Sequence, residues 1–413
     1  MARTKHVLLI FHHYRTPKDL GGLRSWHIGT HLAAQGYQVT AVVPGVDTLT
    51  GKRKEDLGKR LWVKERIHGV NVFWTNALAN DRNSKLKRAL YYCSSSMLQF
   101  FGALRVNEID IVVTTSMPLP AVIGGMMTAW VRRVPFVIEV RDLTIDSGLE
   151  VGYLPSNWLT KAMLNIESWL FRRADRIIAV TQGMRDILVK DKGVEPWRTS
   201  VVPLGFEGQA IYNGLVDWSR DIRVELEIGD KFIVLYSGTL GYVFDIPTIL
   251  RAACETRHRP DILYLFLGGG QNLHEFKAYA ENQGIHCLFL GPRPKHDVPI
   301  FCAQADVCVY AIRQGKALSS ILGNKVFDYL GNGKPVITAS PKGDVQRLIE
   351  TCEAGIRVPS ADGQAMGEAI LSLADDPERL KRFGHNARCC IHKYYQVKDM
   401  MRAFESSIAE SLG

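Results

Sequence analysis

The sequence lacks the features that mark several classes of protein. No uncharged apolar stretch reaches the ~18 residues of a membrane-spanning helix, so we expect no transmembrane segment. The apolar run near the N-terminus, residues 7–11, is too short for a signal peptide and ends in two histidines. The eight cysteines are scattered without the C-x-x-C spacing of a metal site, so free thiols are the simplest expectation. These absences predict a protein of the reducing cytosol.

The glycine-rich turns also lack a dinucleotide-binding fingerprint. Neither "SGTLG" (237–241) nor "LGGG" (267–270) is a G-x-G-x-x-G followed by an acidic residue ~20 positions later, so we expect no nicotinamide cofactor. We find no D-x-D-like pair at the end of a predicted strand and therefore expect no metal. No base-stacking motif accompanies the basic charge, so nucleic acid is not an expected partner.

What the chain does have is a repeated strand-and-helix rhythm. Its 413 residues, 46% of them hydrophobic, are too many for one ordinary core and suit two domains. Short runs rich in Val and Ile alternate with helical patterns, which is typical of buried parallel strands. The pattern restarts at 231–241 after a loop-rich segment, 203–221. We therefore predict two doubly wound α/β domains, 1–205 and 206–389, with the C-terminal helix at about 390–413 packing back on the first.

The net charge of +9 suggests an anionic partner. Lys and Arg mix with aromatic and aliphatic residues in 51–66 and 82–105. The second stretch could be a basic amphipathic helix lying on a membrane, or a solvated helix whose apolar side is simply core. Contact of 50–105 with a membrane surface is therefore one of two open interpretations.

Candidate site residues were sought where strands end, because open α/β sheets bind ligands beyond the carboxyl ends of their strands. Gly21 and Gly22 precede a predicted helix, beside Arg24, and Gly238 follows the first strand of the second domain. Such turns either expose backbone N–H groups to a phosphate or are only tight turns. Arg141 and Asp142, in "EVRDLTIDSG", form either a structural network or a polar wall that orients a hydroxyl group.

The stretch "SILGNKVFDYLGNGKPVITAS", 320–340, carries the sharpest hypothesis. Lys325 starts a predicted helix, so its ammonium and the free N–H groups can meet one anion. Asp328 lies one turn further on and can accept two hydrogen bonds from the hydroxyl groups of a ribose. Arg313, at the end of a strand, offers a second cation. The alternative is a plain Lys325–Asp328 ion pair within the helix, worth less than about 0.5 kcal/mol.

The whole chain resembles the family 4 glycosyltransferases, retaining enzymes with the GT-B fold. It looks most similar to the subgroup that builds bacterial surface polysaccharides and lipid-linked oligosaccharides. The resemblance rests on several segments in the right order: "GGLRSWHIGTHLAAQGYQVTAVVP", "VPFVIEVRDL", "VLYSGTLG" and "NKVFDYLGNGKPVITAS". It implies that Asp328 holds the ribose of a nucleoside diphosphate sugar and that Arg313 and Lys325 lie near its diphosphate.

The same resemblance implies that Gly21 and Gly22 approach the donor from the other domain and that Arg141 and Asp142 line the catalytic space. Two departures stand out. The first acid of the family's E-x7-E pattern is here Ser320, which leaves Ser319, Ser320 and backbone groups to contact the sugar. The basic pair often found after the donor domain's first strand is absent from "SGTLGYVFD".

The implied activity is transfer of a hexose, with retention and without a metal, to a hydroxyl group of a glycan or a polyprenyl-linked acceptor. The resemblance favours UDP as the nucleotide, with GDP open, no cofactor, and a place at the inner face of the cell membrane. Two alternatives stay open at this point. A nucleotide-sugar epimerase of GT-B shape would interconvert sugar nucleotides without acceptor, and a non-catalytic partner subunit would bind nucleotide but need a second chain.

Overall fold

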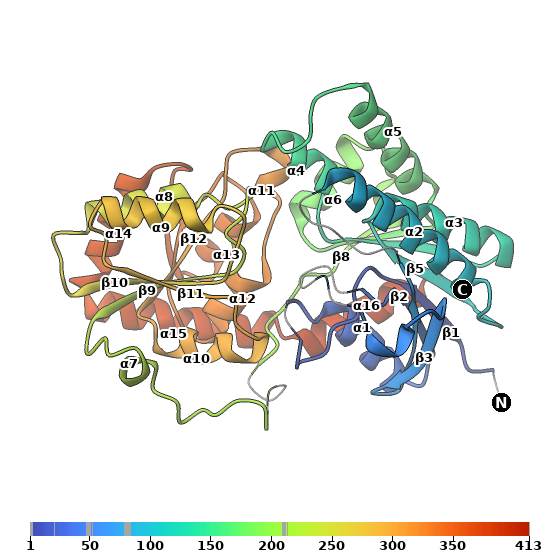
Figure 1. The fold of residues 1–413 in the computed structure, drawn as a ribbon, viewed down its shortest axis with the longest axis horizontal. Helices are drawn as coiled ribbons and strands as arrows, with labels where there is room; N and C mark the ends of the chain where they lie inside the picture. Colours follow the sequence, from blue (N-terminus) through green and yellow to red (C-terminus); the bar gives the residue numbers. More distant parts are fainter. Residues whose placement is uncertain are drawn as a thin grey trace.

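The fold consists of two lobes, each built around a largely parallel sheet (Figure 1). The computed structural model describes residues 3–19, 21–46, 51, 53–77, 84–208, 212 and 214–412. Within these ranges, no helix is long and apolar enough to cross a membrane.

The first lobe holds an eight-stranded sheet in the order β3-β4-β2-β1-β5-β6-β7-β8. All of its neighbours are parallel except β3 and β4, which pair antiparallel. Its strands are β1 His6–Ile10, β2 Gln38–Pro44, β3 Trp62–Ile67, β4 Val70–Thr75, β5 Ile111–Thr115, β6 Phe136–Val140, β7 Arg176–Ala179 and β8 Thr199–Val201.

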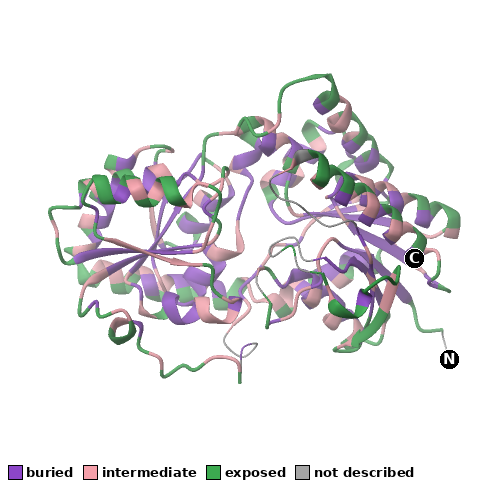
Figure 2. Cartoon of the chain, viewed as in Figure 1, coloured by how far each residue is buried: buried purple, intermediate pink, exposed green. Residues whose placement is uncertain are grey.

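Helices cover both faces of this sheet, which explains why its central strands are buried along their whole length (Figure 2). They are α1 Arg24–Ala34, α2 Lys85–Ala103, α3 Leu119–Arg132, α4 Thr144–Glu150, α5 Trp158–Arg173 and α6 Gln182–Lys190, with short 3-10 turns η1 Glu55–Leu57 and η2 Pro196–Arg198. Two hydrophobic cores result, one on each face.

The second lobe holds a six-stranded, fully parallel sheet in the order β11-β10-β9-β12-β13-β14. Its strands are β9 Phe232–Ser237, β10 Ile262–Leu267, β11 Cys287–Gly291, β12 Val307–Ala311, β13 Val336–Ala339 and β14 Gly355–Val358. Its helices are α7 Ile222–Glu225, α8 Ile246–Glu255, α9 Leu273–Asn282, α10 Val298–Gln304, α11 Lys316–Ser319, α12 Asn324–Gly331, α13 Asp344–Thr351, α14 Gly363–Ala374 and α15 Pro377–Tyr394, with the 3-10 turn η4 Lys295–Asp297.

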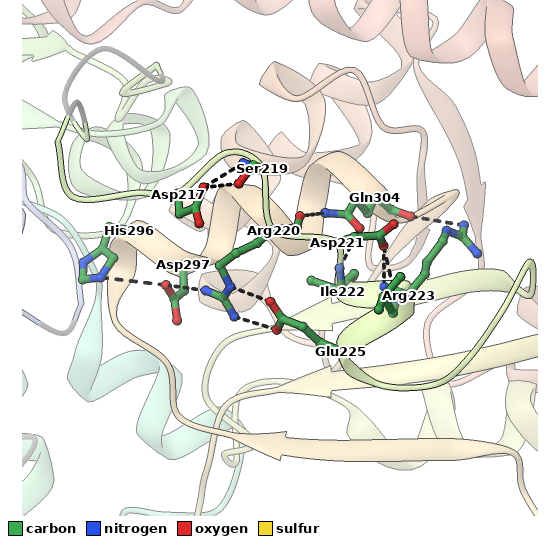
Figure 3. A network of polar contacts seen from close by, with 11 residues as sticks. Asp217, Ser219, Arg220, Asp221, Ile222, Arg223, Glu225, His296, Asp297 and Gln304 are labelled. Atoms are coloured by element: carbon green, nitrogen blue, oxygen red, sulfur yellow. Dashed lines mark hydrogen bonds and ion pairs between the residues drawn. The ribbon is translucent and has the colours of Figure 1, made fainter.

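The chain crosses between the lobes twice. After β8 it runs through a linker, whose residues 217–223 are held on the second lobe by a polar network with η4 and α10 (Figure 3). After α15 it returns as α16, Val397–Ala409. Met401, Phe404 and Ile408 of α16 are buried in a core of the first lobe.

Two features differ from the sequence-based expectation. The basic stretch 51–66 was considered only as a surface, but most of β3 lies in it and forms the antiparallel edge of the first sheet. The expectation of free thiols is wrong for one pair, because Cys352, after α13, and Cys390 of α15 form a disulfide. Residues 38 positions apart meet here because α13 and α15 both flank the same core. That proximity is not visible in the spacing.

Candidate active site

Segments that follow strands of the two sheets touch each other across the lobes. Glu150, at the end of α4, accepts hydrogen bonds from the N–H groups of Ala317 and Leu318 at 2.8 and 3.0 Å. Thr181, which caps α6, donates to the carbonyl oxygen of Ser320 at 2.8 Å. Asp344, at the start of α13, accepts from the N–H of Gly183 at 3.0 Å. The carboxyl edges of the two sheets therefore face each other. Ligands of open α/β sheets bind beyond the carboxyl ends of the strands, so this is where a ligand site is expected.

Lys325 lies on the second-lobe side of this region. Its Nζ donates to the Tyr236 hydroxyl at 2.9 Å and lies 3.6 Å from the centroid of the Phe244 ring. No carboxylate lies beside it in the described part of the chain, and burial lowers its pKa to about 7. An added Cβ at Gly238, which has φ +129°, would come within 2.5 Å of this ammonium. The turn after β9, which lacks its own basic pair, therefore has a cation supplied by α12.

Gly22 faces the same region from the first lobe. An added Cβ there would lie 3.1 Å from the amide nitrogen of Asn324, the first residue of α12. Gly21 beside it has φ +97°, a conformation that favours glycine. Gly22, Gly238 and Lys325 thus lie near the N-terminus of one helix. Their contact with a donor stays a prediction.

Arg141 and Asp142 follow β6 in the first lobe. Glu139 is fully buried and binds both Arg141, with Nε at 2.7 Å, and Arg24, with Nε at 2.5 Å. Burial acts to raise the pKa of Glu139, but the two arginines outweigh it and hold that pKa below its ordinary value. Arg24 also donates to backbone oxygens of Val202 and Pro203. Arg24 is therefore a structural anchor and does not extend the glycine turn toward a ligand.

Asp142 is exposed to solvent, yet enough protein surrounds its carboxylate to desolvate it. This desolvation raises its pKa to about 6, although Arg141 opposes the shift. The charge of Asp142 also contributes to raising the pKa of the Tyr310 hydroxyl in β12, behind the larger effect of burial. The ring of Tyr310 lies 5.6 Å from the Lys325 ammonium. An acidic group of one lobe and a basic group of the other thus flank the same tyrosine.

Four predicted residues remain: Arg313, Ser319, Ser320 and Asp328. Asp328 is 7% exposed and its carboxylate accepts a hydrogen bond from Lys295, so the alternative of a Lys325–Asp328 pair is wrong. Arg313 is exposed, and its side chain has no partner among the described residues. The hydroxyl groups of Ser319 and Ser320 donate to carbonyl oxygens within α11, both at 2.7 Å. The roles assigned to these four residues stay predictions.

Sequence analysis missed several groups at this interface. Lys295 follows β11 and a glycine turn, so the rule that led to Gly238 could have found it. Glu150 and Asp344 carried no such signal, because their role is to accept hydrogen bonds from backbone N–H groups of the other lobe, and those partners cannot be read from the sequence. In the described ranges, no group of three or more His, Cys, Asp or Glu side chains is placed to hold a metal ion.

Comparisons with known proteins agree with this arrangement. Residues 21–205 match the family model described as "Glycosyl transferase 4-like domain", and residues 219–389 match "Glycosyl transferases group 1". The chain is 23% identical over 333 residues to a putative colanic acid biosynthesis glycosyl transferase, WcaI, of Escherichia coli K12, covering 78% of this chain and 80% of that protein.

Two solved structures share the fold. The Anabaena protein Alr3699/HepE, solved with UDP-glucose, superposes with a TM-score of 0.73 at 17% identity over 98% of this chain and 99% of that one. WaaG, described as a glycosyltransferase involved in lipopolysaccharide biosynthesis, superposes with a TM-score of 0.68 at 16% identity over 97% and 98%. The two-lobed architecture and the two family models, which together span most of the chain, lead to one conclusion: this protein belongs to the family 4 glycosyltransferases of the GT-B fold.

Proposed function

We propose that the protein transfers a sugar, with retention and without a metal, from a UDP-sugar to a hydroxyl group of a glycan or lipid-linked acceptor in cell-surface polysaccharide synthesis. The observation that carries the proposal is Lys325, a partly buried lysine at a helix N-terminus that has no carboxylate partner among the described residues. Such a site suits a diphosphate, whose negative charge grows as the sugar leaves.

The acceptor side supplies the second half of the proposed chemistry. Asp142 approaches the same region from the first lobe, and its pKa of about 6 leaves it mostly ionised at neutral pH. There it can orient the acceptor hydroxyl, while the leaving phosphate takes the proton of that hydroxyl. Lys325 and Arg313 would neutralise the leaving group in the role that a divalent metal serves in other transferases.

A screen of nucleotide sugars by thermal shift and by hydrolysis tests the donor. We expect a UDP-sugar to stabilise the protein, and Lys325→Met to abolish the shift while the unliganded protein still unfolds cooperatively. The relatives' names include polysaccharide and lipopolysaccharide enzymes, so lipid extracts of a deletion strain are the place to look for the missing product. Interconversion of UDP-sugars without acceptor would instead identify an epimerase.

We further propose that the acceptor is reached at an anionic membrane surface on the cytoplasmic side. Among the described residues, more than half of the exposed large hydrophobic side chains lie on three neighbouring helices of the first lobe, α2, α3 and α5 (Figure 1). They are Leu86, Leu90, Met97, Phe101, Met127, Trp130, Val131, Trp158, Leu159, Ile166 and Trp169. This surface includes part of the predicted 50–105 segment and extends beyond it.

The charge of these helices suits acidic lipid headgroups. The sequences of α2 and α3 contain no Asp or Glu, and the one acid of α5, Glu167, is buried against Lys192. Exposed Lys161, Arg172 and Arg173 belong to α5, and Arg133 follows α3. Exposed Trp among basic residues is the composition of a membrane-surface anchor.

Vesicle co-sedimentation tests this surface. Trp130 and Trp158 are 81% and 79% exposed. We expect the wild type to sediment with vesicles containing phosphatidylglycerol but not with pure phosphatidylcholine, and the variant with Trp130→Ala and Trp158→Ala to stay in solution. Trp197→Ala, at a tryptophan that is 67% exposed outside the three helices, is the matched control. Equal loss in that control would refute the assigned surface.

A further inference from the structure

A buried cluster of charged and polar groups joins the two lobes and the linker. We call it the hinge cluster, and its members are His27 of α1, Glu207 and Tyr212 of the linker, Lys295 of η4 and Asp328 of α12. Of these, only Asp328 was predicted as a site residue. The cluster lies where the linker joins the two lobes, which we call the hinge. Asp328 of α12 is therefore connected to the linker through the other members of the cluster.

Lys295 is the centre of the cluster. Its Nζ donates to Asp328 Oδ2 and lies 3.9 Å from Glu207 Oε2. Glu207 in turn accepts a hydrogen bond from the Tyr212 hydroxyl, and its other oxygen lies 3.4 Å from His27 Nε2. One ammonium therefore serves two buried carboxylates, one from the donor lobe and one from the linker.

The charge of Lys295 favours the ionised form of Asp328. Burial raises the pKa of Asp328, Lys295 opposes that shift, and the negative charge of Glu207 adds to it. Burial would also raise the pKa of Glu207, but Lys295 and His27 outweigh it and hold that pKa at about 2. The thiol of Cys302 in α10 also faces Lys295 and Tyr212. If the ammonium is removed, two carboxylates face each other in a desolvated space.

The backbone that carries Lys295 is itself fixed to the linker. Asp297, two residues on in η4, accepts a hydrogen bond from Arg220 Nη1 at 3.2 Å (Figure 3). The amide of Gln304 in α10 donates to the Arg220 carbonyl oxygen at 2.8 Å. The Lys295 side chain is therefore presented from a short element held on both sides, as a positioning group requires.

We propose that Lys295 is a positioning residue of the donor site: it holds the Asp328 carboxylate in place for a ribose and, through Glu207, ties that carboxylate to the hinge. This inference rests on the proposed function, in which Asp328 binds the donor's ribose. Lys295 takes only Oδ2, and among the described residues no donor bonds to Oδ1, so one carboxylate oxygen remains for a ribose hydroxyl. Ribose binding then needs no break in the Lys295 contact.

The test compares Lys295→Met with the conservative Lys295→Arg by equilibrium binding of UDP-glucose between about pH 5.5 and about pH 7, each value divided by that of the wild type. Lys295→Met should weaken binding at least about tenfold at the acid end, with recovery as the pH rises and the uncompensated Asp328 ionises. Lys295→Arg should keep a flat ratio. A purely structural lysine would not produce a new pH dependence.

A second variant guards against misfolding. In Lys295→Met with Glu207→Gln the second carboxylate is gone, so the pKa of Asp328 falls and affinity at the acid end should return toward that of the wild type. A flat ratio in Lys295→Met, with affinity within about twofold of the wild type, would overturn the proposal.

An infrared titration separates this inference from the proposed function. Ligand-free Lys295→Met should show the carbonyl stretch of a protonated carboxyl group at about pH 5.5, the acid end of the binding test, and the same protein with Asp328→Asn should not. If the wild type binds no sugar nucleotide while this band appears, the donor assignment fails and the positioning of Asp328 stands. If UDP-glucose binds but the band is absent, the positioning role of Lys295 fails and the proposed donor stands.

Discussion

Lys325 is partly buried and has no carboxylate partner among the described residues. Its surroundings are the rings of Tyr236, Phe244 and Tyr310 and the hydroxyl of Tyr236, which together stabilise an ammonium less than water does. With a pKa of about 7, a large share of the Lys325 side chains is neutral at physiological pH until an anion arrives. In the proposed function a diphosphate would raise the pKa of Lys325, so its binding should take up a proton.

Affinity for UDP-glucose should therefore fall as pH rises from about 7 to about 8.5, by up to about tenfold per pH unit. Below the Lys325 pKa the ammonium is charged in both the free and the bound protein, so the profile should flatten there. The phosphates of a sugar nucleotide do not titrate in this range, which makes UDP-glucose a cleaner probe than UDP. Calorimetry in two buffers of different ionisation enthalpy should report the same proton uptake.

Lys325→Arg is the matched control, since its guanidinium stays charged throughout. We expect it to bind with a flat profile, and Lys325→Met to bind weakly at every pH. A sloping profile in Lys325→Arg would assign the titration to another group.

At this scale the sequence predicts residues by their own position in the chain, and the roles assigned to them stay predictions. Gly22, Gly238 and Lys325 each sit where a strand ends or a helix begins, and the structure gathers them. It could not predict that Asp328 turns to Lys295 while Lys325 turns to aromatic rings. The partner of each side chain depends on which loops pack beside that turn of α12. The spacing of Lys325 and Asp328 along the helix does not show this.

Among the elements, α13 and α15 are covalently linked. Cys352 is buried at the end of α13, and the disulfide to Cys390 closes a loop of 38 residues that contains β14 and α14. A cross-link of this length restricts the unfolded chain and stabilises the fold by about 2–4 kcal/mol.

Reduction should therefore lower the stability of the donor lobe. We expect dithiothreitol to decrease the free energy of unfolding by about 2–4 kcal/mol in urea titrations. The variant with Cys352→Ala and Cys390→Ala should already be destabilised and should not respond to the reductant. A wild type that is equally indifferent would show that the two thiols are not bonded in solution.

The elements also show where sequence patterns are strong and where they are weak. The buried strands β1 and β10 belong to the apolar runs from which the strand-and-helix rhythm was predicted, because a short run of Val, Ile and Leu between polar turns has few other uses. β3 was missed, since its burial is only partial and Lys64, Glu65 and Arg66 interrupt it. An exposed edge strand need not be apolar, so hydrophobicity could not reveal it.

For the molecule as a whole, the two lobes are fastened on two sides. The linker and α16 join them at the hinge. On the opposite edge, Glu150 of the first lobe accepts two backbone N–H groups of the second, and Asp344 of the second lobe accepts one of the first. Each of these two carboxylates belongs to one lobe and bonds to the backbone of the other. They hold the two lobes close to each other without contacting Lys325.

The double variant Glu150→Ala, Asp344→Ala should open the lobes. Each substitution leaves backbone N–H groups without an acceptor, and hydrogen bonds to charged groups contribute about 1.5–3 kcal/mol each. We expect small-angle scattering to give a larger radius of gyration, and sugar transfer to slow while the affinity for the nucleotide stays within about threefold. The hinge contacts remain, so each lobe should keep its own unfolding transition.

Arg347→Ala separates this effect from a change within α13. Arg347 pairs with Asp344 Oδ1 at 2.6 Å inside the donor lobe, whereas the bond to Gly183 uses Oδ2. Removing the guanidinium leaves the contact between lobes in place, so neither the radius of gyration nor the transfer rate should change. Because the two oxygens of one carboxylate serve the two partners, an opening in Arg347→Ala would mean that the lobes are held by the orientation of α13 and not by the Asp344–Gly183 bond.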